Sequence, residues 1–400
     1  MFLMNASYIL TKDKILIDSA IVFDEHIKAI GKKDELLKKF PNTKEIHLED
    51  GSILMPGLIN SHVHLEFSEN STELKYGSFM PWLYSVIEKR DELSEKCGSN
   101  CMKKVLERML LSGTTTVGAI SSWGFDLKPC AESNMKVIYF NEVIGSNPAA
   151  VDALWEHFLD RLEMSKELAS KTFTPAVAIH SPYAVHPVLV KKAVSIVKEQ
   201  KLQLSTHFLE SQAERDWLDN SDGEFVPFFK NFLNLNKAHT TAKEFLENIK
   251  DTRSLVVHAG HASKDELETI KDSGHTVVHC PVSNRLLGND RLDINNLDYL
   301  CATDGLSSNT SLNLFDELKS ALFIHHEKDL HKLAKDLIDS VTSRAATALN
   351  LNRGQIKEGF ESDIIVLNTN RGTIAPEDLH LQILLQKYEV SHTFINGEKI

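Results

Sequence analysis

Short apolar runs, many of them ended by a polar residue, recur along the middle of the chain and alternate with segments of helical periodicity. Such runs are typical of parallel strands that are buried on both faces. The predicted strands are, in chain order, 53–59, 114–119, 136–143, 174–180, 203–207, 254–258, 276–280 and 300–304. The clearest predicted helices are 100–111, 187–199, 313–325 and 330–349. Alternation of this kind predicts the α/β class and a (βα)8 TIM barrel.

Both ends of the chain have a different pattern, with short β-like runs separated by turn residues. These runs cover 8–10, 15–22, 26–31, 45–48, 362–368 and 391–399. Neither end is long enough to fold alone, so we expect one small β-sandwich built from both termini. The predicted division is therefore 1–54 and 351–400 for the two parts of the β-sandwich and 55–350 for the barrel.

Polar residues with metal-binding chemistry lie at the ends of several predicted strands. His62 and His64 are two residues apart and would present both rings on one face of a strand, while His207 and Asp304 end two later strands. A His-x-His pair alone is more often a solvated strand face than a metal site. In a (βα)8 barrel, however, all strand ends converge on one face, so these four residues are expected to meet.

Six short motifs extend this pattern over residues 50–350. They are PGLINSHVHLE (56–66), HSPYAVHP (180–187), STHFLES (205–211), VVHAGHAS (256–263), HCPVSNRLLGN (279–289) and ATDGLSSNTSLNLFDELK (302–319). By these motifs the chain resembles the amidohydrolase superfamily, in its aminohydrolase branch of nucleoside and purine deaminases and chlorohydrolases. The resemblance implies the same barrel and the same terminal β-sandwich.

The resemblance implies that His62, His64, His207 and Asp304 hold one divalent metal, zinc or else iron, with a water in the open position. A metal held this way lowers the pKa of its water from about 15.7 towards 7. Relatives with two metals bridge them with a carboxylated lysine at the end of strand four. That strand ends here in Ala178, Ile179 and His180 without a lysine, which favours a single metal.

The resemblance also assigns the proton-transfer residues. Glu210 would carry a proton to the substrate ring and then to the departing amine, His258 would polarise the attacking water, and Asp304 would accept its proton. The alternative for Glu210 is a carboxylate that stabilises a helix start. His261 is the alternative to His258, which we prefer because it stands at the strand end.

His180, Trp82 and Arg285 are the candidate substrate contacts, although an exposed surface position is the ordinary alternative for Arg285. Adenosine and S-adenosylhomocysteine deaminases of the branch carry acidic residues just before a Trp-Leu pair in the first long connection. The matching segment here, Phe79–Leu83, has no acidic residue. The segment 206–229 is more similar to the deaminases of 6-aminodeoxyfutalosine in the futalosine route to menaquinone. The alternatives are deamination of adenosine, methylthioadenosine, S-adenosylhomocysteine or guanine, or a catalytically inactive barrel scaffold.

Composition narrows the range of partners. The net charge of −12 and the absence of a basic stripe argue against nucleic acid, and no window of about 18 apolar residues predicts a membrane span. The five cysteines are scattered, and we expect Cys97 and Cys101 to be free thiols in a reduced cytoplasm. The expected partners are a small adenine nucleoside and water, with a homodimer implied by the family alone.

Overall fold

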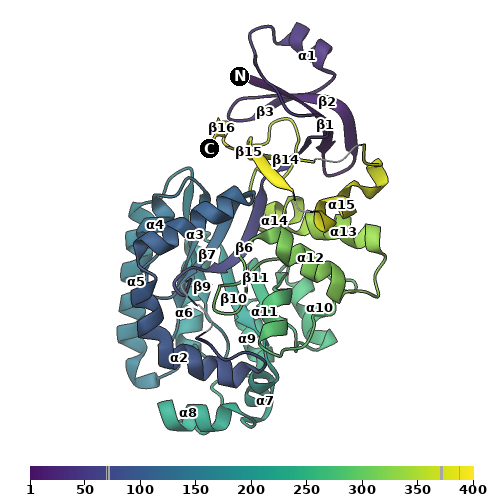
Figure 1. The fold of residues 1–400 in the computed structure, drawn as a ribbon. Helices are drawn as coiled ribbons and strands as arrows, with labels where there is room; N and C mark the ends of the chain where they lie inside the picture. The colour runs from purple at the N-terminus through teal and green to yellow at the C-terminus, as the bar shows by residue number, and fades with distance from the viewer. Residues whose placement is uncertain (69, 71–72, 370–372, 387) are drawn as a thin grey trace.

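The computed structural model describes residues 1–400 except 69, 71–72, 370–372 and 387. The described chain forms a parallel barrel and a separate mixed sheet to which both termini contribute (Figure 1). The mixed sheet lies at the top of Figure 1, and helices α2 (Phe79–Lys96), α7 (Gln212–Asn220) and α8 (Phe225–Leu233) lie at the opposite end. The predicted fold class is therefore confirmed.

The barrel strands follow one another in chain order, and each pairs in parallel with the next. They are β6 (Leu58–His64), β7 (Thr114–Ser121), β8 (Lys136–Val143), β9 (Phe173–Ile179), β10 (Leu204–Phe208), β11 (Ser254–His258), β12 (Thr276–His279) and β13 (Tyr299–Cys301). Every described residue of β7, β8, β10 and β11 is buried. Burial on both faces explains why β11 and the middle of β8 read as apolar runs.

Side chains close the seam between the first and last barrel strands. Asn60 donates from Nδ2 to Oγ1 of Thr303 at 2.8 Å, and the Thr303 N–H donates back to Oδ1 of Asn60 at 3.2 Å. Beyond this pair, the Asp304 N–H donates to the carbonyl of His62 at 3.1 Å. The seam therefore fixes the two strand ends that carry His62 and Asp304.

Helices surround the barrel and occupy the long connections. In addition to α2, α7 and α8 they are α3 (Ser99–Leu111), α4 (Leu127–Ala131), α5 (Val151–Glu167), α6 (Pro187–Gln200), α9 (Ala242–Ile249), α10 (Lys264–Asp272), α11 (Pro281–Leu286), α12 (Leu314–Ile324), α13 (Leu330–Ser340), α14 (Ser343–Ala348) and the 3₁₀ turn η1 (Pro148–Ala150). Capping boxes begin α9 and α10, where Thr241 and Ser263 accept from the N–H groups of Glu244 and Glu266. The predicted helix 330–349 is instead two helices, because the non-helical backbone of Thr342 separates α13 from α14.

The mixed sheet is the expected small β-domain, and its described strands form one continuous sheet. In chain order they are β1 (Phe2–Leu10), β2 (Ile15–Phe23), β3 (Ile27–Gly31), β4 (Lys44–Ile46), β5 (Ile53–Pro56), β14 (Ile364–Asn368), β15 (Glu389–Ile395) and β16 (Glu398–Lys399). Helix α1 (Lys33–Lys39), the 3₁₀ turn η2 (Pro376–Asp378) and helix α15 (Leu379–Leu385) complete this part of the chain.

The apolar run 53–59 is divided between the two sheets. Strand β5 pairs with β1 and β14 in the mixed sheet, and β6 starts the barrel after Gly57. A Cβ atom at Gly57 would lie 2.2 Å from Oγ1 of Thr115, so a larger residue does not fit at this crossing.

A buried ion network joins the barrel to the mixed sheet. The ammonium of Lys136, whose side chain is 2% exposed, lies 2.7 Å from Glu361 and 2.8 Å from Asp363. Arg353 adds a contact of 3.0 Å to Glu361. The network lies at the amino end of β8, away from the end that carries the strand-end histidines.

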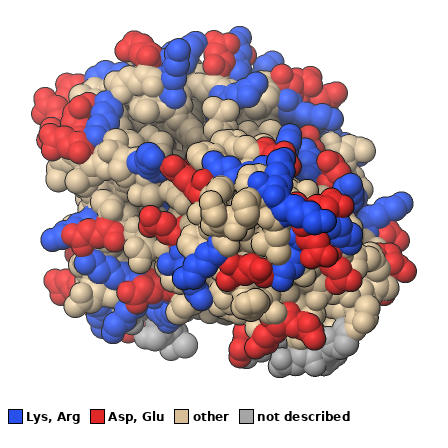
Figure 2. Space-filling view, turned by 90° about the horizontal axis from the view of Figure 1, so that it is seen from above, with Lys and Arg blue, Asp and Glu red and all other residues tan. Residues whose placement is uncertain are grey.

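The described chain contains a disulfide and has a surface of mixed charge. Cys97 and Cys101 form a disulfide, so the prediction of free thiols is wrong for this pair, because the turn between α2 and α3 brings their Cα atoms within 5.2 Å. Among the described residues no helix is long and apolar enough to cross a membrane. Figure 2 shows basic and acidic side chains interspersed over the face that it displays.

Candidate active site

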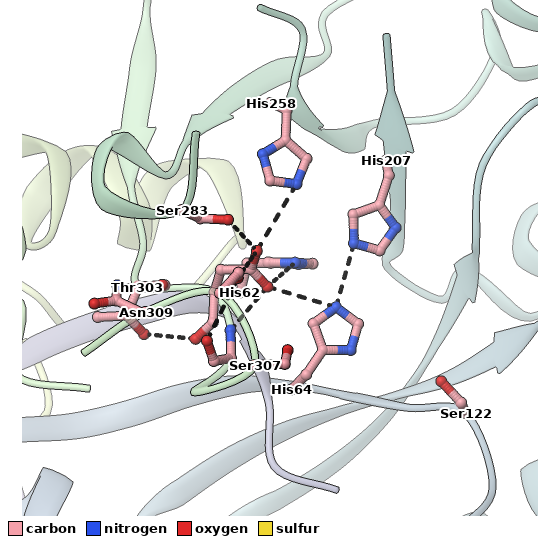
Figure 3. A network of polar contacts seen from close by, with 12 residues as sticks. His62, His64, Ser122, His207, His258, Ser283, Thr303, Ser307 and Asn309 are labelled. Carbon is pink, nitrogen blue, oxygen red and sulfur yellow. Dashed lines mark hydrogen bonds and ion pairs between the residues drawn. The ribbon is translucent and has the colours of Figure 1, made fainter. Parts of the chain in front are cut away.

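Three histidines converge at the carboxyl end of the barrel, as Figure 3 shows. His62 and His64 come from β6 and His207 comes from β10, and one ring nitrogen of each lies within 4.8 Å of the others. Nε2 of His64 is 3.2 Å from Nε2 of His207. Asp304, three residues after Cys301 ends β13, places Oδ1 3.5 Å from Nε2 of His62 and 3.8 Å from Nε2 of His64. The structure thus brings together all four predicted metal ligands.

The hydrogen bonds of this cluster fit a divalent metal. His62 is fully buried, and in the part of the chain that the structure describes its Nδ1 has no hydrogen-bond partner while its Nε2 has only the 3.5 Å contact with Asp304. His207 donates from Nδ1 to the carbonyl of His180 at 2.7 Å, which leaves Nε2 free as a ligand atom. Burial lowers the pKa of His64 to about 4 and that of His207 well below its ordinary value, so both rings are neutral donors to a metal.

Asp304 is held firmly by its neighbours. Its Oδ2 accepts from the hydroxyl groups of Ser283 at 2.8 Å and Ser308 at 2.9 Å. Burial alone would raise the pKa of Asp304, but the nearby histidines, His62 first, lower it well below its ordinary value. Asp304 is therefore a fixed carboxylate that faces the histidine cluster.

His258 and Glu210 lie beside the cluster and face each other. Nε2 of His258 is 3.6 Å from Oε1 of Glu210 and 4.0 Å from Oδ2 of Asp304. On its other side, His258 donates from Nδ1 to Oδ1 of Asn284 at 2.9 Å, which fixes Nε2 as the acceptor. Burial lowers the pKa of His258 and raises that of Glu210 well above its ordinary value, an effect to which Asp304 and Glu214 add. The arrangement offers a neutral imidazole and a proton-holding carboxyl group at one point.

A second pair, buried Glu142 and half-buried His180, lies next to His207. Oε1 of Glu142 accepts from Nδ1 of His180 at 2.8 Å, and Oε2 of Glu142 accepts from the hydroxyl of Ser122. Burial acts to lower the pKa of His180, but the Glu142 carboxylate outweighs it and the pKa is raised. Glu142 was not among the predicted site residues. Like those residues, however, it is an ionisable residue near the carboxyl end of a barrel strand, here β8.

These groups lie at the base of a cavity of about 370 Å³. Its lining includes the predicted residues His64, His207, Glu210, His258, Asp304, His180 and Trp82. The indole N–H of Trp82 donates to the carbonyl of Ser307 at 2.8 Å, so the ring itself lines the wall. Further aromatic lining comes from Phe67, Phe79, Trp123, Tyr183, Phe228 and Phe229. The volume lies within the usual range for a site that binds one small molecule.

Some histidines and one arginine lie away from this cavity. Arg285 is exposed on α11 and does not line the cavity, because the buried face of this short helix carries Ser283 and Asn284 instead. His261, the alternative to His258, also lies outside the lining and is 3.8 Å from Asp290. From the sequence alone we expect the histidines of the late helices, such as His325, to face solvent; this is wrong for His325, whose ring is buried with its Nε2 3.1 Å from Nε2 of His279.

Comparison with known proteins agrees with the resemblance predicted from the six motifs. The amidohydrolase family matches residues 53–400. The chain is 45% identical over 394 residues to the aminodeoxyfutalosine deaminase of a Nitratiruptor species, covering 98% of this chain and 97% of that protein. It is 35% identical over 399 residues to the adenosine deaminase of Helicobacter pylori, covering 97% and 96%. The crystal structure of Helicobacter pylori aminofutalosine deaminase in complex with methylthio-coformycin matches with a TM-score of 0.95 and 34% identity over 100% of both chains.

Proposed function

The chain belongs to the amidohydrolase family and is a hydrolytic deaminase, and from this premise we propose that its substrate is 6-aminodeoxyfutalosine. The reaction would replace the 6-amino group of this adenine nucleoside with oxygen from water and release ammonia, in the futalosine route to menaquinone. The observation that carries the proposal is the proton-transfer cluster of Glu210, His258 and Asp304 at the base of an aromatic cavity. The substrate carries a benzoate group in addition to the adenine, which suits a cavity with many aromatic and apolar lining residues.

We propose that His62, His64, His207 and Asp304 hold one divalent metal, with zinc as the first candidate and iron as the second. The buried ring of His62 supports this set, because apart from the 3.5 Å contact of Nε2 with Asp304 its nitrogens have no partner within the described chain. Glu142, His180 and His207 form a second group with metal-ligand atoms, but Oε1 of Glu142 and Nδ1 of His180 are already hydrogen-bonded to each other. When bound, a metal of this kind acts as a Lewis acid that makes water acidic enough to react near neutral pH.

The protein side chains would manage the protons. Oε1 of Glu210 would give a proton to the ring nitrogen next to C6 and, in a second transfer, a proton to the departing amine. Nε2 of His258 would accept a hydrogen bond from the attacking water, and Asp304 would take up the first proton that the water loses. The second water proton, on the new C6 hydroxyl group, would pass through Glu210 to the departing amine, and the proton on Asp304 would return to Glu210 for the next cycle. The net change is one C–O bond formed and one C–N bond broken.

The remaining lining groups would orient the purine. His180, held at Nδ1 by Glu142, is free to donate from Nε2 to a ring nitrogen of the substrate. Trp82 offers an apolar ring whose N–H is already satisfied. These contacts would place C6 over the histidine cluster and keep bulk water away from it.

Adenosine is the second candidate substrate, favoured by the 35% identity to the Helicobacter pylori adenosine deaminase. Ammonia release by the metal-replete protein from 6-aminodeoxyfutalosine, adenosine, methylthioadenosine, S-adenosylhomocysteine and guanine distinguishes the candidates. We expect the highest kcat/KM with 6-aminodeoxyfutalosine. A higher value with adenosine would overturn the proposed substrate, and no turnover of any of the five would indicate an inactive scaffold.

A further inference from the structure

The lining of the deaminase cavity includes one positively charged side chain that the proposed chemistry does not use. Among the described residues that line the cavity, Arg90 is the only lysine or arginine. It lies on α2, the helix that also supplies Trp82 and Phe79 to the wall. Arg285, the cation expected from the sequence, does not reach this space.

The contacts of Arg90 leave part of its guanidinium available. Its Nε donates to Oδ1 of Asp91 at 2.9 Å, and within the described chain neither terminal nitrogen has a hydrogen-bond partner. The side chain is 46% exposed, and its guanidinium carbon lies 5.5 Å from the centre of the Trp123 ring. Stacking of this kind holds a guanidinium in place while its edge remains free to bind an anion.

The loop beneath Arg90 is itself fixed. Buried Glu66 accepts from the N–H groups of Ser122 at 2.9 Å, Trp123 at 3.0 Å and Phe125 at 3.4 Å. The Trp123 ring is therefore a preorganised support for Arg90 and a flat apolar surface at the same time.

Charge indicates on which side of Arg90 an anion would bind. A neighbouring hollow of about 340 Å³ shares Arg90 and Trp123 with the cavity, but Asp91 and Glu95 line it. These carboxylates repel an anion on that side. On the cavity side, the nearest described lining groups are apolar or aromatic, among them Val86, Ile87 and Trp123.

We infer that Arg90 and Trp123 form a subsite for an aryl carboxylate, with the terminal nitrogens of Arg90 binding the carboxylate and Trp123 packing against the aromatic ring. The inference rests on the proposed function, because the benzoate of the proposed substrate is the group that would occupy this subsite. A planar, two-pronged guanidinium matches the two oxygens of a carboxylate.

The test compares kcat/KM for 6-aminodeoxyfutalosine and for 5′-methylthioadenosine, which has the same adenine nucleoside core but no carboxylate. Arg90→Gln should lose about 10- to 100-fold with the carboxylated substrate, mainly through KM, since a hydrogen bond to a charged group is worth about 1.5–3 kcal/mol. The same variant should stay within about threefold of the wild type with 5′-methylthioadenosine. With the methyl ester of 6-aminodeoxyfutalosine, Arg90→Gln should show no such loss of kcat/KM.

Lys89→Gln is the matched control, because Lys89 is the neighbouring cation on α2, pairs with Glu92 and does not line the cavity. It should match the wild type on all three substrates. The subsite alone would be overturned if Arg90→Gln lost no kcat/KM with 6-aminodeoxyfutalosine. It would also be overturned if the loss were the same with this acid, its methyl ester and 5′-methylthioadenosine. Failure of the wild type to turn over 6-aminodeoxyfutalosine would overturn the proposed function and the subsite together.

Discussion

Three residues at the site have a left-handed backbone that amino acids other than glycine rarely adopt. They are Leu209 (φ 46°), His258 (φ 70°) and Asp304 (φ 59°). Such conformations cost about 1–3 kcal/mol each and persist only where the surroundings enforce them. Around Asp304 the enforcing contacts are the hydroxyl groups of Ser283 and Ser308 and the carbonyl of His62. Of these three residues, His258 and Asp304 line the cavity.

The tautomer of His258 depends on one residue. Asn284 is buried and accepts from Nδ1 of His258, so Asn284→Ala should release the ring and lower kcat by about 10- to 100-fold while the metal content stays unchanged. Steady-state kinetics together with metal analysis measure both effects. Arg285→Ala is the control, because this exposed neighbour on α11 lies outside the cavity and should retain full activity. Equal activity of Asn284→Ala and the wild type would contradict the role given to this hydrogen bond.

The strand ends could be predicted from the sequence, while their supporting contacts could not. His62, His64, His207, His258 and Asp304 were predicted because apolar strands end in residues with metal-binding or acid–base chemistry. Glu142 and Asn284 act through other side chains, and no spacing along the chain shows which ring they would contact. No helix was predicted between residues 65 and 99 or between 208 and 253, where the structure has α2, α7, α8 and α9. Several of their aromatic residues line the cavity, and which of them do so depends on the tertiary structure.

The seam between β6 and β13 gives a prediction at the level of the strands. Asn60→Ala removes both hydrogen bonds to Thr303 and should loosen the strand ends that carry His62 and Asp304. We expect metal affinity to fall about 10- to 100-fold, as measured by competition with a chelator.

Ser205→Ala is the matched control for the seam. Ser205 stands two residues before His207, as Asn60 stands two residues before His62, and within the described chain its buried hydroxyl has no hydrogen-bond partner. Unchanged metal affinity in Asn60→Ala would show that the seam does not position the ligands.

In the molecule as a whole, stability and chemistry are located at opposite ends of the barrel. The buried network of Lys136, Glu361 and Asp363 ties the mixed sheet to the amino end of the strands, while the cavity lies at the carboxyl end. The sequence predicted the two-part architecture because both termini are β-like. It could not predict the burial of Lys136, since a lysine at the start of a strand is ordinarily exposed.

Lys136→Met should destabilise the protein, because it leaves the buried carboxylate of Asp363 without its ammonium partner. The expected cost is about 3–5 kcal/mol of unfolding free energy, seen as a lower Tm. Lys171→Met is the control, since Lys171 also joins the two parts of the molecule, through Glu25, but on the exposed surface. Its Tm should stay close to that of the wild type. Equal Tm values for the two variants would contradict the structural role of the network.

The most direct test of the account is the turnover of Glu210→Gln at full metal occupancy. Glu210 faces His258 across 3.6 Å, and glutamine keeps its shape but cannot carry the proton. We predict one metal per chain and a kcat for 6-aminodeoxyfutalosine that is lower by about 10²–10⁴-fold or more. A metal-replete Glu210→Gln variant with near-normal kcat would contradict proton transfer by Glu210.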